Sequence, residues 1–231
     1  MKTAIVTGAA GNMGRAIVTK LLNSGYRVIG TTSRHDVVPI DIAHEHFEKK
    51  EIDLLSEKEV TAFVASIISS YEKIDVAILT VGGFASGDIA NTDGAAITRQ
   101  IELNFLTAYH VARPVFLQMM QQPYGRIFLI GSKPGLDVAY GNGMVAYGLG
   151  KSLLFRLAEL MNEEAKGNNI VTSVVVPGTI DTAQNRKAMP HVNPQNWVTT
   201  EAIANILHYH CSDEANALRE TVIKIYGNSW A

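Results

Sequence analysis

The segment TGAAGNMG, Thr7 to Gly14, decides the fold of this chain. It follows the short β-branched run Thr3–Thr7 and leads directly into a helical pattern over Gly14–Ser24. Glycines at its second, fifth and eighth positions permit a tight turn, a close approach of the backbone to a phosphate, and close packing of the helix on the strand. In this strand–turn–helix context the spacing predicts a site for a dinucleotide, with the pyrophosphate at the helix N-terminus.

Similar apolar runs recur along the chain and alternate with helical patterns. We expect strands at Thr3–Thr7, Arg27–Thr31, Glu51–Leu54, Val76–Thr80, Gly125–Ile130, Ile170–Val176 and Val222–Tyr226. We expect helices at Gly14–Ser24, Glu57–Tyr71, Gly94–Gln121, Ala146–Ala165 and Thr200–Cys211, with a bend at Pro114. The alternation predicts a single α/β domain over residues 1–231, a Rossmann-type doubly wound sheet of seven mostly parallel strands with helices on both faces. Ligand sites of such sheets lie at the carboxyl ends of the strands, where the winding reverses.

Composition excludes several classes of protein. The 231 residues are 47% hydrophobic and 18% charged, which is typical of a folded domain and unlike a disordered chain. A formal net charge of −2 provides no field that would attract nucleic acid or an anionic membrane, so we expect neither partner. The lone Cys211 excludes an intrachain disulfide and is typical of a reducing compartment. The N-terminal apolar run is too short for a signal sequence, and we expect a cytoplasmic protein.

No metal site is predicted. His44 and His46 alternate with acidic residues in DIAHEHFEKK, but no third ligand stands at metal spacing. They are better explained as a solvated face, and the same holds for His208 and His210 in the last predicted helix.

The end of the second predicted strand indicates which dinucleotide is bound. An acidic residue there would bind the adenosine ribose of NAD(H), whereas a cation would accommodate the 2′-phosphate of NADP(H). The segment VIGTTSR has no carboxylate, and Ser33 and Arg34 can hold a phosphate together. The sequence therefore favours NADP(H) over NAD(H), with Asp36 as an alternative ribose ligand.

Asp53 and Leu54 follow near the expected position of the adenine. Asp53 has two interpretations: its carboxylate accepts a hydrogen bond from the adenine amino group, or it stabilises the N-terminus of the following helix. Both remain open at this point.

A catalytic group is indicated just past the fifth predicted strand, where the segment GRIFLIGS ends at Ser132. Tyr147 and Lys151 follow four residues apart on a predicted helix, so their side chains share one face. A nearby ammonium group stabilises a phenolate, and we expect it to lower the pKa of Tyr147. Tyr147 would then serve as a general acid or base, with Ser132 hydrogen-bonded to the reacting oxygen.

Together these motifs resemble the short-chain dehydrogenase/reductase family, and the resemblance covers essentially the whole chain. It is carried by TGAAGNMG, Asp53, the Gly82-Gly83 pair, Asn104 in IELNFLTAY, Ser132, Tyr147 with Lys151, and PGTIDT from Pro177 to Thr182. The resemblance implies that Tyr147 donates a proton to a carbonyl and that Lys151 binds the nicotinamide ribose. It implies that Asn104 holds a water in a proton relay, an interpretation compatible with a helix-kink residue that bonds backbone.

With the positions inferred above, the resemblance gives a set of expected cofactor contacts. They are Gly8, Gly11, Asn12, Met13, Gly14, Ser33, Arg34, Asp53, Leu54, Val81, Gly82, Lys151, Pro177, Gly178, Ile180 and Thr182. The chain departs from the common family pattern in two places. Asn12 replaces the middle glycine, and Thr80-Val81-Gly82-Gly83 replaces the usual Asn-Ala-Ala-Gly, so contacts there are expected to be backbone contacts or altered.

The segment at about 179–198 is long and polar, which is typical of a substrate lid. With VGGFASG and GLDVAYGNGMVAYG, it resembles quinonoid dihydropteridine reductases and an allied bacterial subgroup. Those enzymes favour NADH and lack equivalents of Asn104 and Ser132. We therefore expect an NADP(H)-dependent reductase of a small ketone or aldehyde built on a related lid.

Three alternatives stay open. The catalytic set is also similar to 3-oxoacyl-[acyl-carrier-protein] reductases, although the predicted helix ends offer few cations to dock an acidic carrier. A dihydropteridine-reductase-like activity is the second alternative. A dinucleotide-binding redox sensor without catalysis is the third, and it belongs to another class. By analogy with the family we expect a homo-oligomer, a dimer or tetramer, assembled through Gly94–Gln121 and Ala146–Ala165.

Overall fold

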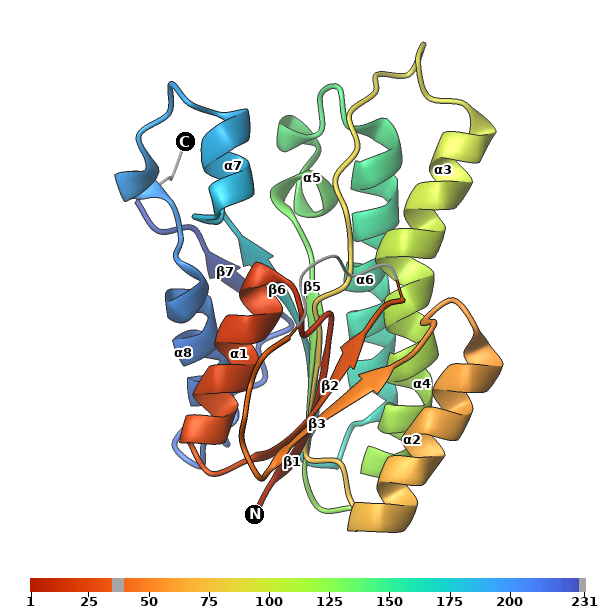
Figure 1. The fold of residues 1–231 in the computed structure, drawn as a ribbon. Coiled ribbons are helices and arrows are strands. Elements are labelled where there is room, and N and C mark those ends of the chain that lie inside the picture. Colours follow the sequence, from red (N-terminus) through yellow and green to blue (C-terminus); the bar gives the residue numbers. More distant parts are fainter. Residues whose placement is uncertain (35–39, 229–231) are drawn as a thin grey trace.

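The computed structural model describes residues 1–34 and 40–228, so Asp36 lies outside the described residues. Its strands are β1 (Thr3–Thr7), β2 (Arg27–Thr32), β3 (Phe47–Glu51), β4 (Val76–Leu79), β5 (Gly125–Ile130), β6 (Ile170–Pro177) and β7 (Val222–Ile225). They form one sheet in the order β3-β2-β1-β4-β5-β6-β7 (Figure 1), and every neighbouring pair is parallel. The predicted doubly wound fold is confirmed, and the winding reverses between β1 and β4.

Helices cover both faces of the sheet (Figure 1). They are α1 (Asn12–Asn23), α2 (Glu57–Tyr71), α3 (Gly94–Ile101), α4 (Thr107–Met119), α5 (Lys133–Leu136), α6 (Val145–Glu164), α7 (Ala183–Ala188) and α8 (Thr200–His210). One apolar core joins the sheet to α1 and α8, and a second joins it to α2, α4 and α6. Strands buried on both sides are continuous apolar runs, which is why the central strands were recognisable in the sequence. Within the described residues, no helix is long and apolar enough to cross a membrane.

The third strand was predicted wrongly at Glu51–Leu54, because β3 runs from Phe47 to Glu51. It lies at the edge of the sheet and pairs only with β2, and its last three residues are exposed. Charged residues are common on edge strands, and they hid the apolar pattern here. Asp53 instead forms a turn before α2, where its Oδ1 accepts a hydrogen bond from the Leu55 amide at 2.9 Å.

The long helix predicted over Gly94–Gln121 is interrupted. Between α3 and α4 the backbone forms a π-helical turn at Glu102–Leu106, while Pro114 lies inside α4. A π-helical turn accommodates one extra residue and changes the direction in which its side chains point. Asn104, at the centre of this turn, is completely buried.

Candidate active site

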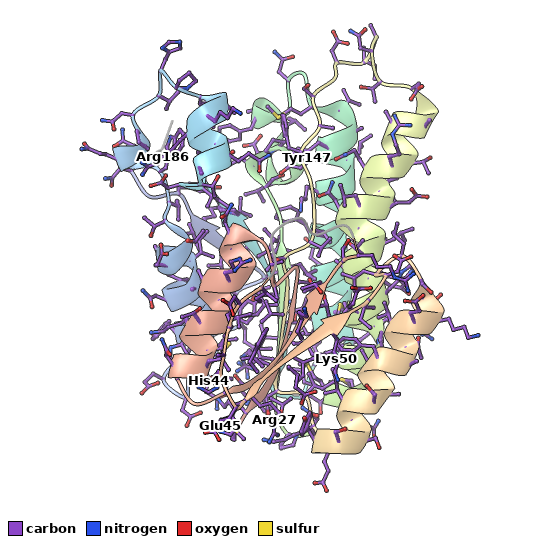
Figure 2. The ribbon with its side chains drawn as sticks, in the orientation of Figure 1. Arg27, His44, Glu45, Lys50, Tyr147 and Arg186 are labelled. Atoms are coloured by element: carbon purple, nitrogen blue, oxygen red, sulfur yellow. The ribbon has the colours of Figure 1, made fainter. Side chains whose placement is uncertain are left out.

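The candidate catalytic residues lie at the carboxyl end of the sheet. Ser132 follows β5, Asn104 belongs to the π-helical turn, and Tyr147 and Lys151 lie in the first half of α6. Figure 2 shows Tyr147 at the same end of the molecule as α7, and His44 at the opposite end. His44 therefore lies far from the site (Figure 2).

The Ser132 hydroxyl lies close enough to the Tyr147 phenol to lower its pKa. Ser132 is buried, and its Oγ accepts a hydrogen bond from the Gly135 amide at 3.2 Å, which caps α5 and fixes the side chain. The edge of the Phe84 ring faces Tyr147, with 5.3 Å between ring centroids. The structure thus brings the predicted serine and tyrosine together and adds an aromatic neighbour from the loop after β4.

Lys151 is almost completely buried, and its Nζ donates a hydrogen bond to the carbonyl oxygen of Ile130 at 2.7 Å. Burial lowers the pKa of Lys151 to about 8. Burial also raises the pKa of Tyr147, against a smaller lowering by the nearby Ser132 hydroxyl. The predicted lowering of the Tyr147 pKa by Lys151 was therefore wrong in direction, because desolvation of the phenolate dominates at this position.

The Asn104 side chain holds the loop after β4 in place through two hydrogen bonds to its backbone. Its Oδ1 accepts a hydrogen bond from the Gly83 amide at 3.0 Å, and its Nδ2 donates to the Gly83 carbonyl oxygen at 3.0 Å. The same Nδ2 donates to Gln100 Oε1 at 2.8 Å. These contacts bear out the interpretation of a kink residue that bonds backbone. Gln100 was missed by sequence reasoning, although its position one helical turn before Asn104 was a usable signal.

Gly82 lies between the side chains of Asn104 and Lys151, where there is no room for a larger residue. A Cβ at Gly82 would lie 2.6 Å from Asn104 Oδ1 and 2.8 Å from Lys151 Nζ. We expect Gly82→Ala to lower kcat about tenfold, because displacing either polar group misplaces the catalytic set. Steady-state kinetics will measure this, and Gly94→Ala is the control, since a Cβ there meets nothing within 4 Å. A wild-type kcat in Gly82→Ala would show that the close packing of Gly82 against Asn104 and Lys151 is not needed for turnover.

The glycine loop has the shape that a pyrophosphate requires. Gly8 adopts a φ of 62°, and a Cβ at Gly14 would lie 2.2 Å from the Gly8 carbonyl oxygen, so α1 packs directly against the turn. Gly11 and Asn12 are exposed at the start of α1, which has no side-chain cap and no acidic residue in its first turn. Free amides at a helix N-terminus suit an anion, so the cradle fits a dinucleotide phosphate.

The end of β2 presents Arg34 beside an acidic neighbour that was not predicted. Arg34 Nε lies 3.4 Å from Glu51 Oε1, and both side chains are largely exposed. Nearby, Leu54 is buried, and its carbonyl oxygen lies 2.9 Å from His110 Nδ1. The Asp53 carboxylate is held in the turn before α2 by the Leu55 amide, and the N-terminus of α2 is capped by Ser56 instead.

The expected lid contains regular structure. Gly178 follows β6 and donates its amide to the Ile225 carbonyl oxygen at 2.8 Å. Ile180 forms a parallel bridge with Val198, which ties both ends of the segment together. Thr182 caps α7 by accepting the Asn185 amide at 3.1 Å. The polar composition that predicted a loop thus includes the capping signals of a short helix.

Comparison with known proteins identifies the family. The family model described as short chain dehydrogenase matches residues 2–193. The chain belongs to the short-chain dehydrogenase/reductase family. This confirms the resemblance stated from the motifs, and such a chain is an NAD(P)-dependent oxidoreductase.

Individual relatives of this short-chain dehydrogenase are distant. An acetoacetyl-CoA reductase of Acinetobacter sp. is 28% identical over 189 residues, 77% of this chain and 73% of that protein. The 3-oxoacyl-[acyl-carrier-protein] reductase FabG of Escherichia coli is 25% identical over 240 residues, 99% of this chain and 97% of that protein. The Thermoplasma acidophilum aldohexose dehydrogenase structure has a TM-score of 0.84 at 22% identity and covers 100% of this chain and 94% of its own. The structure described as ElxO with NADP bound has a TM-score of 0.87 at 20% identity, covering 99% and 98%. These two structures support the fold.

The described residues of this short-chain dehydrogenase include no group of three or more His, Cys, Asp or Glu side chains placed to hold a metal ion. Cys211 is buried, and burial raises the pKa of its thiol to about 12. The side chains gathered at the carboxyl end of the sheet are instead a phenol, an alcohol, an ammonium group and an amide.

Proposed function

We propose that this short-chain dehydrogenase is a cytoplasmic, single-domain carbonyl reductase that uses NADP(H) in preference to NAD(H) and acts on a small ketone or aldehyde. The observation that carries the proposal is that three side chains meet at the carboxyl end of β5: Ser132 lies beside the Tyr147 phenol, and the buried Lys151 follows one helical turn further along α6. Acid catalysis and an oriented hydrogen-bond donor are what carbonyl reduction requires of the protein.

Tyr147 is the proton donor in this proposal. Burial raises the pKa of its phenol, so the group carries its proton at neutral pH and can deliver it to a forming alkoxide. Ser132 donates a hydrogen bond to the same oxygen and orients the carbonyl. Lys151 binds the nicotinamide ribose, and Asn104 fixes the adjacent loop and holds a water of the proton relay. When bound, the nicotinamide supplies the hydride that joins the carbonyl carbon.

The cofactor-binding residues are proposed in groups. Gly8, Gly11, Asn12, Met13 and Gly14 hold the pyrophosphate, and Ser33 with Arg34 holds the 2′-phosphate. The remaining contacts, to the adenine, the ribose and the nicotinamide, come from Asp53, Leu54, Val81, Gly82, Lys151, Pro177, Gly178, Ile180 and Thr182. The exposed N-terminus of α1, which has no side-chain cap, and the cation at the end of β2 support this arrangement.

A 3-oxoacyl thioester reductase is the second candidate function. Phe84 packs against Tyr147, Ile89 belongs to the same loop after β4, and Val138 lies in a short 3-10 helix between α5 and α6. The three residues are 64%, 81% and 92% exposed. The Gly87 amide donates to the Gly143 carbonyl oxygen at 2.7 Å, which holds the first of these loops against the segment before Tyr147. An apolar rim suits an acyl chain better than a small polar substrate. The named activities of the two curated relatives agree with this candidate.

We also propose a homo-oligomer, a dimer or tetramer, assembled through α4 and α6. Leu117 on α4 and Leu160 on α6 are both more than half exposed, and Leu149 and Leu153 of α6 add to this apolar surface. Exposed apolar helix faces of this kind are typical of subunit interfaces. Light scattering of the purified chain tests the proposed assembly.

The function is tested by a carbonyl panel. Small ketones and aldehydes, 3-oxoacyl thioesters and quinonoid pterins are each offered with NADPH and with NADH. The assay follows the loss of absorbance of the reduced nicotinamide. We expect consumption of NADPH with one class of carbonyl. Binding of NADPH without consumption across the panel would instead support a redox sensor and contradict the proposal.

A further inference from the structure

The ion pair between Arg34 and Glu51 places a carboxylate at the end of β2, where the sequence predicted a phosphate site without an acidic residue. Glu51 is the last residue of β3, and its Oε1 lies 3.4 Å from Arg34 Nε. In register, Glu51 stands opposite Thr32, the last residue of β2, and the next amide, that of Ile52, donates to the Thr32 carbonyl oxygen at 3.0 Å. The carboxylate therefore belongs to the same sheet corner as Ser33 and Arg34.

The side chain of Glu51 lies on the glycine-loop face of the sheet. Phe47, four residues earlier on β3, packs against Gly30 in the core shared with α1. Glu48 lies on the other face, where its carboxylate accepts a hydrogen bond from the Tyr71 hydroxyl of α2. Because side chains alternate along a strand, Glu51 shares the face of Phe47 and not that of Glu48.

We propose that Glu51 is a cofactor-selectivity residue, and that its carboxylate weakens the preference for NADP(H) over NAD(H) that Arg34 provides. This inference rests on the dinucleotide site of the proposed function. With NAD(H), the Glu51 carboxylate accepts a hydrogen bond from the adenosine ribose, which is the role that an acidic residue at the end of β2 plays in other dinucleotide sites. With NADP(H), the same carboxylate repels the 2′-phosphate and competes with it for Arg34.

The ion pair between Arg34 and Glu51 can open easily because both side chains are exposed to solvent. The side chains of Arg34 and Glu51 are 72% and 58% exposed, and an exposed ion pair contributes little to stability. Arg34 can therefore exchange Glu51 for a phosphate without disturbing the fold. The same exposure means that removing the Glu51 charge should leave stability unchanged, so an effect on binding can be assigned to the cofactor site.

The test is the ratio of dissociation constants for NADH and NADPH, measured by the fluorescence of the reduced nicotinamide without any substrate. Glu51→Gln keeps the shape of the side chain and removes its charge. We expect the ratio to shift about tenfold toward NADPH, both by tighter NADPH binding and by weaker NADH binding. Glu48→Gln is the matched control, because it makes the same charge change on the opposite face of β3, and its ratio should equal that of the wild type.

The outcomes separate this inference from the proposed function. The wild-type ratio tests the preference for NADP(H), whereas the change on Glu51→Gln tests the role of Glu51 whichever nucleotide the wild type prefers. A folded Glu51→Gln variant with the wild-type ratio overturns the inference, as does an equal shift in Glu48→Gln. A wild-type chain that binds neither nucleotide overturns both proposals.

Discussion

Replacing Tyr147 with phenylalanine is expected to lower kcat about 10³-fold, because general-acid catalysis by a positioned side chain contributes roughly 10²–10⁴-fold. The substitution removes only the hydroxyl beside Ser132 and retains the ring that packs against Phe84. Dinucleotide affinity should therefore stay close to that of the wild type. Steady-state kinetics with the best carbonyl of the panel, together with nucleotide titration, measures both quantities.

Tyr140→Phe is the matched control for this substitution. It removes the same group from a partly exposed tyrosine in the segment between α5 and α6, and it retains the ring over which Lys133 lies. Wild-type kcat is expected. Appreciable turnover by Tyr147→Phe, or an equal loss in Tyr140→Phe, would show that the proton comes from elsewhere.

Replacing Lys151 with methionine is expected to lower turnover strongly and to stabilise the protein. Folding lowers the pKa of this lysine from 10.5 to about 8, which opposes folding near neutral pH by on the order of 3 kcal/mol. Methionine retains the apolar stem, but it loses the hydrogen bond to the Ile130 carbonyl oxygen and so offsets about 1 kcal/mol or more of this gain. We expect the free energy of unfolding to rise by roughly 1–2 kcal/mol, with kcat lowered about 10³-fold.

The pH dependence of stability tests the cause of this effect. Between pH 8 and 10.5 the unfolded chain binds the lysine proton more tightly than the folded chain does, so wild-type stability rises with pH across this window. The stability gained by Lys151→Met relative to the wild type should consequently shrink as the pH rises through this window and disappear above the window. Denaturant unfolding without nucleotide measures this, with the exposed Lys166→Met as control. A variant less stable than the wild type near neutral pH would show that Lys151 carries no desolvation penalty.

Local sequence was enough for the features that depend on neighbours in the chain. The glycines of Thr7–Gly14, the apolar runs of the central strands and the four-residue spacing of Tyr147 and Lys151 all report local geometry, and the structure agrees with each. The edge strand β3 was misplaced because its exposed charged residues carry no apolar period. The π-helical turn was missed because propensity does not distinguish it from an α-helix.

The sequence by itself determined the fold class, the glycine turn before α1 and the identity of the candidate catalytic side chains, since each depends on a short motif. Only the tertiary structure decided their surroundings. Burial sets the direction of the pKa shifts of Tyr147 and Lys151, and strand pairing brings Glu51 beside Arg34 although the two are 17 positions apart in the sequence. Desolvation and charge pairing depend on which groups meet across the sheet, and the order of residues along the chain does not contain that information directly.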